Sequence, residues 1–256
     1  MRKYGFAVVE GPHDVEFVYR LLSPYGLSRV CNEIDLDLIL KPLIPREYPP
    51  DGDLQKRMPT PLFLQSDSHS IAVHSAQGDQ RLIQTIEENL TYFDFYQITG
   101  IGILLDSDKE ASPNNRYVAI RDQMRKLNLA LGDVSGSVSS GTPKCGAYVL
   151  PDNLSPGTLE DLLLECAKNV YPRLLSSAVD YVDRTSEDTT LTTDDLKDFR
   201  KPSGRNKAII GTIASILRPG KAIQASIQDN RWLRNSALEI PRVKAVQVFL
   251  AKIFEL

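Results

Sequence analysis

The sequence predicts an α/β protein with a mostly parallel sheet, helices on both faces, and a helical C-terminal region. Two observations predict this class. Short apolar runs alternate with amphipathic segments through the first 167 residues, and from residue 168 onward the periodicity is helical only. Alternating strands and helices build parallel sheets that are covered on both faces. We therefore divide the chain into a core, residues 1–167, and a helical region, residues 168–256, packed against it.

The strands of the core are predicted from apolar runs that end at turn residues. Residues 4–10 (YGFAVVE) and 98–105 (ITGIGILL) are the clearest of these runs. Further strands are expected over 33–40, 71–75 and 147–150. Apolar residues at helical spacing follow each junction. They predict core helices from residue 14 and over 79–90, 114–130 and 157–167.

The remaining segments are predicted from breakers and from helical spacing. Residues 41–66 hold six of the sixteen prolines, so we expect an insertion or a long surface loop there. Residues 132–146, rich in Gly and Ser, are expected to form a loop near the site. The C-terminal helices are expected over 168–182, 205–218, 221–228 and 242–254.

Composition indicates an ordinary soluble globular protein. The chain has 256 residues, 42% of them apolar and 25% charged, which suffices for a core without disulfides. No apolar run approaches the roughly 18 residues of a membrane span, and the run after Arg2-Lys3 is too short for a signal peptide. Cys31, Cys145 and Cys166 are odd in number and far apart, so we expect reduced thiols and a cytoplasmic location.

The charge is unevenly distributed along the chain. Residues 200–256 contain eleven Lys or Arg and three Asp or Glu, a charge of +8, so the first 199 residues carry −11 of the net −3. An acidic body with a basic tail suits a polyanion held against bound metal ions. The alternative is a helical segment with a basic solvated face. The candidate phosphate contacts are Arg205, Lys207, Arg218, Lys221, Arg231 and Arg234.

Acidic residues follow three of the predicted strands. They are Glu10 and Asp14, then Asp106 and Asp108, then Glu160 and Asp161. Ligands of open α/β sheets lie beyond the carboxyl ends of the strands, and hard divalent cations take oxygen ligands. The pattern predicts a magnesium or manganese site formed by these six carboxylates. The alternative is that they serve as helix N-caps and first-turn residues.

Two of these junctions resemble motifs of the Toprim family. Residues 8–14 (VVEGPHD) resemble its first motif, a strand ending in Glu-Gly, and residues 103–108 (ILLDSD) resemble its Asp-x-Asp motif. Toprim is the catalytic module of topoisomerases, bacterial primases, recombination factors and the overcoming-lysogenization-defect (OLD) nucleases. Residues 149–167 and the tail from Lys207 to residue 254 are similar to a stand-alone family of small Toprim-related proteins.

The resemblance implies a Toprim-like fold and a metal-binding role for the first two acidic pairs. Glu10 matches the Toprim glutamate, which is a metal ligand in the nucleases and a proposed general base in topoisomerases. Asp106 and Asp108 match the metal-binding Asp-x-Asp. Asp14 lies four residues after Glu10, where the OLD-type nucleases carry a second ligand.

The resemblance extends to two later positions. Thr158-Leu159-Glu160 is similar to the Ser-x-Glu element of the OLD-type nucleases, and Lys207 lies about where these nucleases place an active-site lysine. The sequence also departs from the family. Pro12 and His13 stand where many relatives have a lysine, and no glycine closely follows the Asp-x-Asp pair.

Three other residues have simpler interpretations. His69 and His74 lie five apart near the Pro-rich segment without a neighbouring cysteine, so we interpret them as exposed loop histidines rather than zinc ligands. Trp232 could stack a base, but a lone Trp in a helical tail is more typical of a core.

Carboxylate-held metals can activate a water and stabilise the leaving oxygen of a phosphodiester. The sequence therefore predicts magnesium-dependent cleavage of nucleic acid, DNA or RNA, with Glu10, Glu160 and Lys207 as catalytic residues. Two alternatives stay open: a non-catalytic Toprim module that binds nucleic acid or a partner protein, and a nucleotidyl transferase or phosphohydrolase acting on small nucleotides. Since OLD-type nucleases often work beside an ATPase and this sequence has no Walker motif, a separate ATPase partner is also a hypothesis.

Overall fold

The computed structural model describes residues 2–47, 52, 54, 60–92, 97–108 and 112–256, and it confirms the predicted α/β class. One sheet has the strand order β2-β3-β4-β1-β5-β6. β4, β1, β5 and β6 run parallel, and β3 and β2 extend the β4 edge in antiparallel fashion. The strands are β1 (Lys3–Val9), β2 (Ser28–Arg29), β3 (Leu62–Gln65), β4 (His69–Ser75), β5 (Ile98–Asp106) and β6 (Lys144–Leu150).

The chain reverses its direction across the sheet at β1. From β1 it crosses to β4 on one side, and it later returns to β5 on the other side of β1. In open parallel sheets the ligand crevice lies beyond the carboxyl ends of the strands at such a switch point. Glu10 directly follows β1 and Asp106 ends β5, so both lie at this point.

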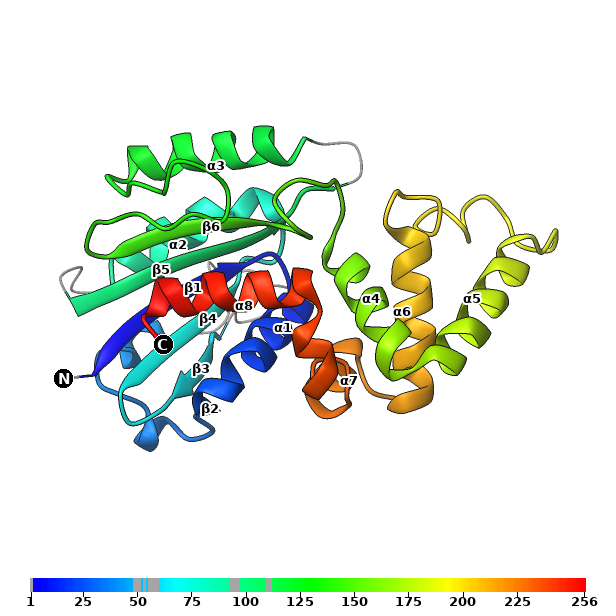
Figure 1. The fold of residues 1–256 in the computed structure, drawn as a ribbon, viewed down its shortest axis with the longest axis horizontal. Coiled ribbons are helices and arrows are strands. Elements are labelled where there is room, and N and C mark those ends of the chain that lie inside the picture. Colours follow the sequence, from blue (N-terminus) through cyan, green and yellow to red (C-terminus); the bar gives the residue numbers. More distant parts are fainter. Residues whose placement is uncertain (1, 48–51, 53, 55–59, 93–96, 109–111) are drawn as a thin grey trace.

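Helices cover both faces of the sheet, as Figure 1 shows. The first face carries α1 and α8, and the opposite face carries α2 and α3. β1 alternates accordingly, because Ala7 and Val9 pack toward α1 and α8 while Phe6 and Val8 pack toward α2 and α3. The α-helices of the described residues are α1 (Pro12–Leu22), α2 (Leu82–Leu90), α3 (Pro113–Lys126), α4 (Leu159–Val170), α5 (Pro172–Ser186), α6 (Gly204–Leu217), α7 (Ile223–Asp229) and α8 (Pro241–Phe254).

The last helix, α8, lies close on the sheet because three strands present glycine beneath it. Gly5 of β1, Gly100 of β5 and Gly146 of β6 lie against Ile253 or Phe254, and a Cβ atom at any of the three would overlap with them. The apolar side of α8 is buried there. One face of the sheet is therefore covered in part by a helix from the end of the sequence.

The other C-terminal helices form a lobe beside the sheet. Figure 1 shows α4, α5 and α6 standing together, and α7 contacts both α6 and α1. The buried Trp232 joins these parts, since its Nε1 donates to Ser226 Oγ at 2.9 Å and its ring packs edge-on against Tyr171. The prediction that Trp232 is a core residue is confirmed. The predicted division after residue 167 falls inside α4, and α8 returns from the lobe to the sheet.

Two sequence-based expectations near the N-terminus are wrong. Residues 33–40, predicted as a strand, instead form a 3-10 turn (Glu33–Asp35) and further local turns with backbone bonds such as Leu36 N–H to Glu33 O. Leu36 and Leu40 are buried four residues apart, so the alternating pattern reflects a turn that packs two leucines. The Pro-rich segment 41–66 is not only a loop, because Leu62–Gln65 (β3) pairs with β4. Residues 48–51, 53 and 55–59 of that segment lie outside the described residues.

The interpretation of His69 and His74 as exposed loop residues is also wrong. Both belong to β4 and are only 8% and 6% exposed. β4 begins at His69, two residues before the predicted start, which brings this histidine into the sheet.

Among the described residues, no helix is both long enough and apolar enough to span a membrane.

Candidate functional site

Four of the six predicted acidic ligands lie close together where the sheet meets the helical lobe. Glu10 follows β1, Asp14 lies in the first turn of α1, Asp106 ends β5 and Glu160 lies in the first turn of α4. The charges of Asp14, Glu10 and Glu160 all act on Asp106. We call these four residues the acidic cluster.

Backbone hydrogen bonds fix the carboxylates of the cluster. Glu10 Oε1 accepts the N–H of Asp106 at 2.8 Å, and Asp106 Oδ1 accepts the N–H of Leu159 at 2.9 Å. Asp14 Oδ2 accepts the N–H of Gly11 at 2.9 Å, which closes the start of α1. The carboxylates of Glu10, Asp106 and Asp14 are thus tied to the N-terminal end of a helix or to the neighbouring strand.

Buried Ser107 holds the end of β5 against the connection between β6 and α4. Its N–H donates to the carbonyl oxygens of Leu150 and Gly157, at 3.2 and 3.1 Å. Its Oγ accepts the N–H of Gly157 at 3.3 Å. The residue between the two aspartates therefore sets the distance between Asp106 and the start of α4, where Glu160 lies.

Burial raises the pKa of three carboxyl groups of the acidic cluster, Glu10, Asp14 and Asp106. Burial, together with the charges of Asp108 and Asp79, raises the pKa of Glu10 to about 7 against the opposing effects of the Asp106 N–H and Arg116. Burial and the charges of Glu10 and Glu160 raise the pKa of Asp14 to about 7. The pKa of Asp106 is raised well above its usual value, again chiefly by burial. Four carboxyl groups so close together are stable when protonated or when paired with a cation.

The donor set fits a hard divalent cation. Glu160 is only 6% exposed, and within the described part of the chain its Oε2 is buried without a hydrogen-bond partner. The hydrogen bonds of Glu10 and Asp106 use one oxygen of each carboxylate. In the described residues no three or more His, Cys, Asp or Glu side chains are yet arranged as a metal-coordinating group. Glu10, Asp106 and Glu160 are the residues that would hold a cation.

The other two predicted ligands lie elsewhere. Asp108 has φ of 55° and an exposed side chain at the rim of the cluster, where its charge reaches Glu10. Asp161 caps α4, because its Oδ2 accepts the Thr158 N–H at 2.8 Å and its Oδ1 accepts Asn206 Nδ2 at 2.8 Å. Both Asp161 oxygens accept hydrogen bonds, which supports the alternative of a capping role.

Arg116 is a site residue that the sequence analysis missed. It lies in the second turn of α3. Its Nε donates to the Asp106 carbonyl oxygen at 3.3 Å, its Nη1 lies 3.3 Å from Asp79 Oδ2 and its Nη2 lies 3.5 Å from Glu10 Oε1. The only sequence signal was an arginine shortly after the Asp-x-Asp motif, which no motif that we used contains.

Lys207 and His13 approach the cluster from the opposite side. Burial lowers the pKa of His13, the negative charge of Glu160 raises it and the positive charge of Lys207 lowers it. The charges of Glu160, on α4, and Lys207, an exposed residue of α6, thus both reach His13 on α1. The catalytic role of Lys207 stays a prediction.

The predicted phosphate contacts do not form one surface. Arg205 and Arg218 lie near opposite ends of α6, 13 residues and therefore about 20 Å apart along the axis. Arg205 forms two hydrogen bonds with Asp183, and Arg218 Nη2 lies 2.9 Å from Asp229. These pairs reduce the net charge that a polyanion would meet.

Three predicted contacts lie farther along the chain. The guanidinium of Arg231 lies over the Tyr171 ring at 5.3 Å, and Arg234 Nη2 donates to the Asp229 carbonyl oxygen. Lys221 is exposed in the turn between α6 and α7. Of the six predicted phosphate contacts, Lys207 is the one whose charge acts on His13, whose pKa the charge of Glu160 also affects.

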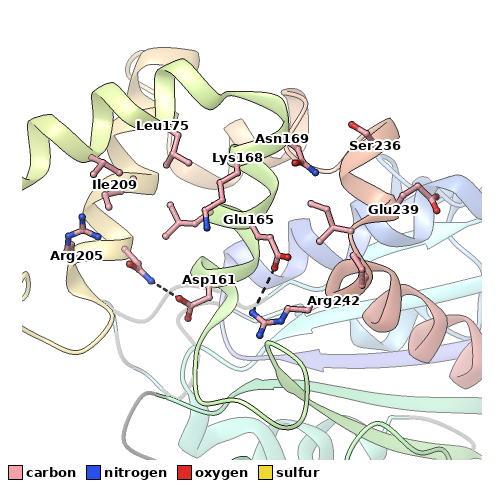
Figure 2. A pocket seen from close by; sticks show the side chains of 15 residues that line it. Asp161, Glu165, Lys168, Asn169, Leu175, Arg205, Ile209, Ser236, Glu239 and Arg242 are labelled. Atoms are coloured by element: carbon pink, nitrogen blue, oxygen red, sulfur yellow. Dashed lines mark hydrogen bonds and ion pairs between the residues drawn. The ribbon is translucent and has the colours of Figure 1, made fainter.

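A groove of about 860 Å³ runs along the exposed side of α4 (Figure 2). Asp161, Glu165 and Lys168 form its base, Arg205 lies on one side and Arg242 on the other. Both arginines are paired with carboxylates. The groove begins one residue from Glu160, and its charges are largely balanced.

The fold and the acidic cluster define a class: an α/β protein with convergent carboxylates at the switch point of its sheet. The chain belongs to the family described as "Protein of unknown function (DUF3226)", whose family model matches residues 7–255. No curated protein matches the sequence. The crystal structure of a hypothetical protein from Pyrococcus horikoshii OT3 is similar, with a TM-score of 0.53 and 15% identity over 99% of this chain and 95% of that chain. This likeness supports the fold alone.

Proposed function

We propose that this protein is a divalent-metal-dependent phosphodiesterase that cleaves nucleic acid. The observation that carries the proposal is the acidic cluster, in which Glu10, Asp14, Asp106 and Glu160 converge from three strand–helix junctions. The resemblance to Toprim motifs at Glu10 and Asp106 supports it. A divalent cation held there would supply positive charge to the transition state of phosphodiester cleavage.

The proposed role of each site residue follows from its position. Glu10 and Asp106 lie at neighbouring strand ends and would hold the cation. Glu160 faces the same space from α4, with one oxygen left to bind the cation or orient the attacking water. The charge of Lys207 reaches His13, as that of Glu160 does, which supports a role for its ammonium group in binding a phosphate oxygen of the substrate.

The helices around the cluster favour an anionic substrate. α1 and α4 begin at the cluster, as the backbone bonds of Gly11 and Leu159 show. α6 begins beside them, since Asn206 in its first turn bonds to Asp161. Helix N-termini carry a partial positive charge, which stabilises carboxylates and phosphate alike.

The test is an incubation of the purified protein with labelled DNA and RNA panels and with nucleotides, in Mg²⁺, Mn²⁺ or EDTA. We expect cleavage in either metal and none in EDTA. Glu160→Gln should abolish it, whereas Glu165→Gln, a matched change that faces the groove one turn farther along α4, should leave it unchanged. If wild-type protein cleaves none of these substrates in any metal, the proposal is wrong.

One observation favours a second candidate, a phosphohydrolase or nucleotidyl transferase acting on small nucleotides. Arg205, Arg218 and Arg242 are paired with carboxylates, and the groove beside the cluster has balanced charges. A short substrate needs only the contacts at the cluster, whereas a long polyanion gains from a continuous basic surface. Release of phosphate from nucleotides without cleavage of DNA or RNA would select this candidate.

A further inference from the structure

Arg116 connects three parts of the sheet edge. Its guanidinium reaches the carbonyl oxygen of Asp106 at the end of β5, Asp79 before α2, and Glu10 after β1. Its side chain is only 25% exposed, so this cation is held in a partly desolvated position. A guanidinium in such a position binds oxygen anions through fixed, planar donors.

The contact between Arg116 and Glu10 is incomplete. Nη2 lies 3.5 Å from Glu10 Oε1, and within the described part of the chain it is buried without a hydrogen-bond partner. The same Glu10 oxygen accepts the Asp106 N–H at 2.8 Å. Arg116 therefore contributes charge to the cluster while one of its donors stays available.

A metal ion and Arg116 would act on the same carboxylate. Glu10 already feels the positive charge of Arg116. A metal ion that binds Glu10 gains less binding energy while Arg116 stays beside this carboxylate, because the two cations repel each other across a partly buried space. A phosphate oxygen next to a metal at the cluster would in turn lie within reach of the unpartnered Nη2.

We propose that Arg116 competes with the metal for Glu10 in the free protein and contacts a phosphoryl oxygen of the substrate in the loaded protein. This inference rests on the proposed function, because it needs a metal on the cluster and a phosphate at the site. The pair Asp79–Arg116 keeps the guanidinium at the edge of the cluster in both states. Arg116 is then a specificity residue for the phosphate group.

The first experiment measures Mn²⁺ binding to the metal-free full chain by calorimetry at pH 7.5. Arg116→Met should bind Mn²⁺ roughly tenfold more tightly, because a competing cation about 4 Å from the ligand has been removed. Arg116→Lys keeps the charge and should bind Mn²⁺ close to the wild-type affinity. Arg125→Met, on the same helix but 63% exposed, is the matched control and should change nothing.

The second experiment titrates inorganic phosphate into the Mn²⁺-saturated protein. Both Arg116→Met and Arg116→Lys should lose roughly tenfold in phosphate affinity, since neither presents two parallel donors. Arg125→Met should again match the wild type. Circular dichroism and thermal melts establish that each variant is folded, and Arg116→Lys serves as the test if Arg116→Met is not.

The outcomes separate this inference from the proposed function. Unchanged or weaker Mn²⁺ binding by Arg116→Met, or unchanged phosphate affinity of folded Arg116→Lys, overturns the role of Arg116 even when the wild type cleaves nucleic acid. Tighter Mn²⁺ binding by Arg116→Met with weaker phosphate binding supports the role even when no substrate is cleaved. A wild-type protein that binds no Mn²⁺ overturns both.

Discussion

The backbone N–H of Asp106 donates to the carboxylate of Glu10 across 2.8 Å, which joins the ends of two neighbouring parallel strands. The two residues are 96 positions apart in sequence. A change at either one should therefore affect the other.

The first prediction concerns metal binding at this pair. Asp106→Asn should reduce Mn²⁺ affinity at least tenfold in calorimetry, because it removes the charge of the most central carboxylate of the cluster. Asp108→Asn should have a smaller effect, since Asp108 lies exposed at the rim. An Asp106→Asn protein that binds Mn²⁺ as the wild type does would contradict the assignment.

The second prediction separates Glu160 from Asp161. Glu160→Gln removes a buried carboxylate oxygen without a hydrogen-bond partner in the described residues, so it should raise the stability of metal-free protein by about 1 kcal/mol and weaken Mn²⁺ binding. Asp161→Asn removes the cap of α4, so it should lower stability by about 1 kcal/mol and leave Mn²⁺ binding unchanged. Urea denaturation and calorimetry measure the two effects. If Glu160→Gln instead lowers stability and leaves Mn²⁺ binding unchanged, Glu160 has only a structural role.

The third prediction concerns pH. The pKa values of Glu10 and Asp14 are about 7 in the folded protein and about 4 in an unfolded chain, so the folded state binds more protons between these values. The contribution of these two groups to the stability of metal-free protein should therefore be full below about pH 4 and should be lost as the pH rises through 7, by on the order of 2–4 kcal/mol. Saturating Mn²⁺ should restore it at pH 8.

The control for this pH dependence is Asp106→Asn. Burial lowers the pKa of His13 and His69, which adds a slope of the opposite sign to both proteins, so the difference between wild type and variant isolates the cluster. Asp106→Asn should lose less stability than the wild type between pH 5 and 8. Equal losses in urea melts would mean that the cluster is not the cause.

The fourth prediction concerns the basic residues. Lys207→Gln should weaken nucleic-acid binding in Mn²⁺ more than Arg218→Gln does, because the charge of Lys207 reaches His13, as that of Glu160 does, and Arg218 lies near the far end of α6, paired with Asp229. For Lys207→Gln, the slope of log affinity against log salt concentration should become less steep by about one unit, the value expected for one lost phosphate contact. Fluorescence anisotropy at several salt concentrations measures both. A larger loss for Arg218→Gln would move the binding surface away from the cluster.

The fifth prediction concerns the packing of α8. Gly100→Ala places a Cβ against the backbone of Ile253, so it should cost about 1–3 kcal/mol of stability. Gly141→Ala meets only ordinary contact distances and should change stability by less than about 0.5 kcal/mol. Thermal or urea denaturation of both variants measures the difference, and equal stabilities would contradict the close approach of α8.

Much of the fold follows from local patterns in the sequence. β1, β4 and β5 are apolar runs that end at turn residues, and the amphipathic helices keep their period, so these elements were predicted close to their observed bounds. β6 begins at Lys144, three residues before its predicted start, so the end of the predicted loop 132–146 belongs to the sheet. The edge strand β2 and its neighbour β3 were missed because they are short and are stabilised by pairing with distant residues rather than by their own pattern. Residues 33–40 were wrongly predicted as a strand because their apolar residues alternate. In the structure they pair with no described strand and form a turn instead.

Residues of the candidate site could be predicted only where they lie at a strand–helix junction that the sequence pattern indicates. Glu10, Asp106 and Glu160 each end a strand or start a helix, and parallel topology then brings them together. The capping role of Asp161 depends on Asn206, and the role of Arg116 depends on Glu10 and Asp79, which are distant in sequence. Such pairings follow from three-dimensional packing, which a spacing pattern does not encode.

The position of α8 has a consequence for biosynthesis. β6 ends at Leu150 and α8 begins at Pro241, so residues 151–240 leave the ribosome after the sheet but before its cover. Until α8 arrives, α1 covers only part of this face, and Leu104 and Tyr148 present an apolar surface that α8 later covers. Partly synthesised chains with such surfaces are prone to aggregate. We therefore expect a chain that terminates before residue 241 to require chaperones and to accumulate as insoluble protein, even though it contains Glu10, Asp14, Asp106 and Glu160.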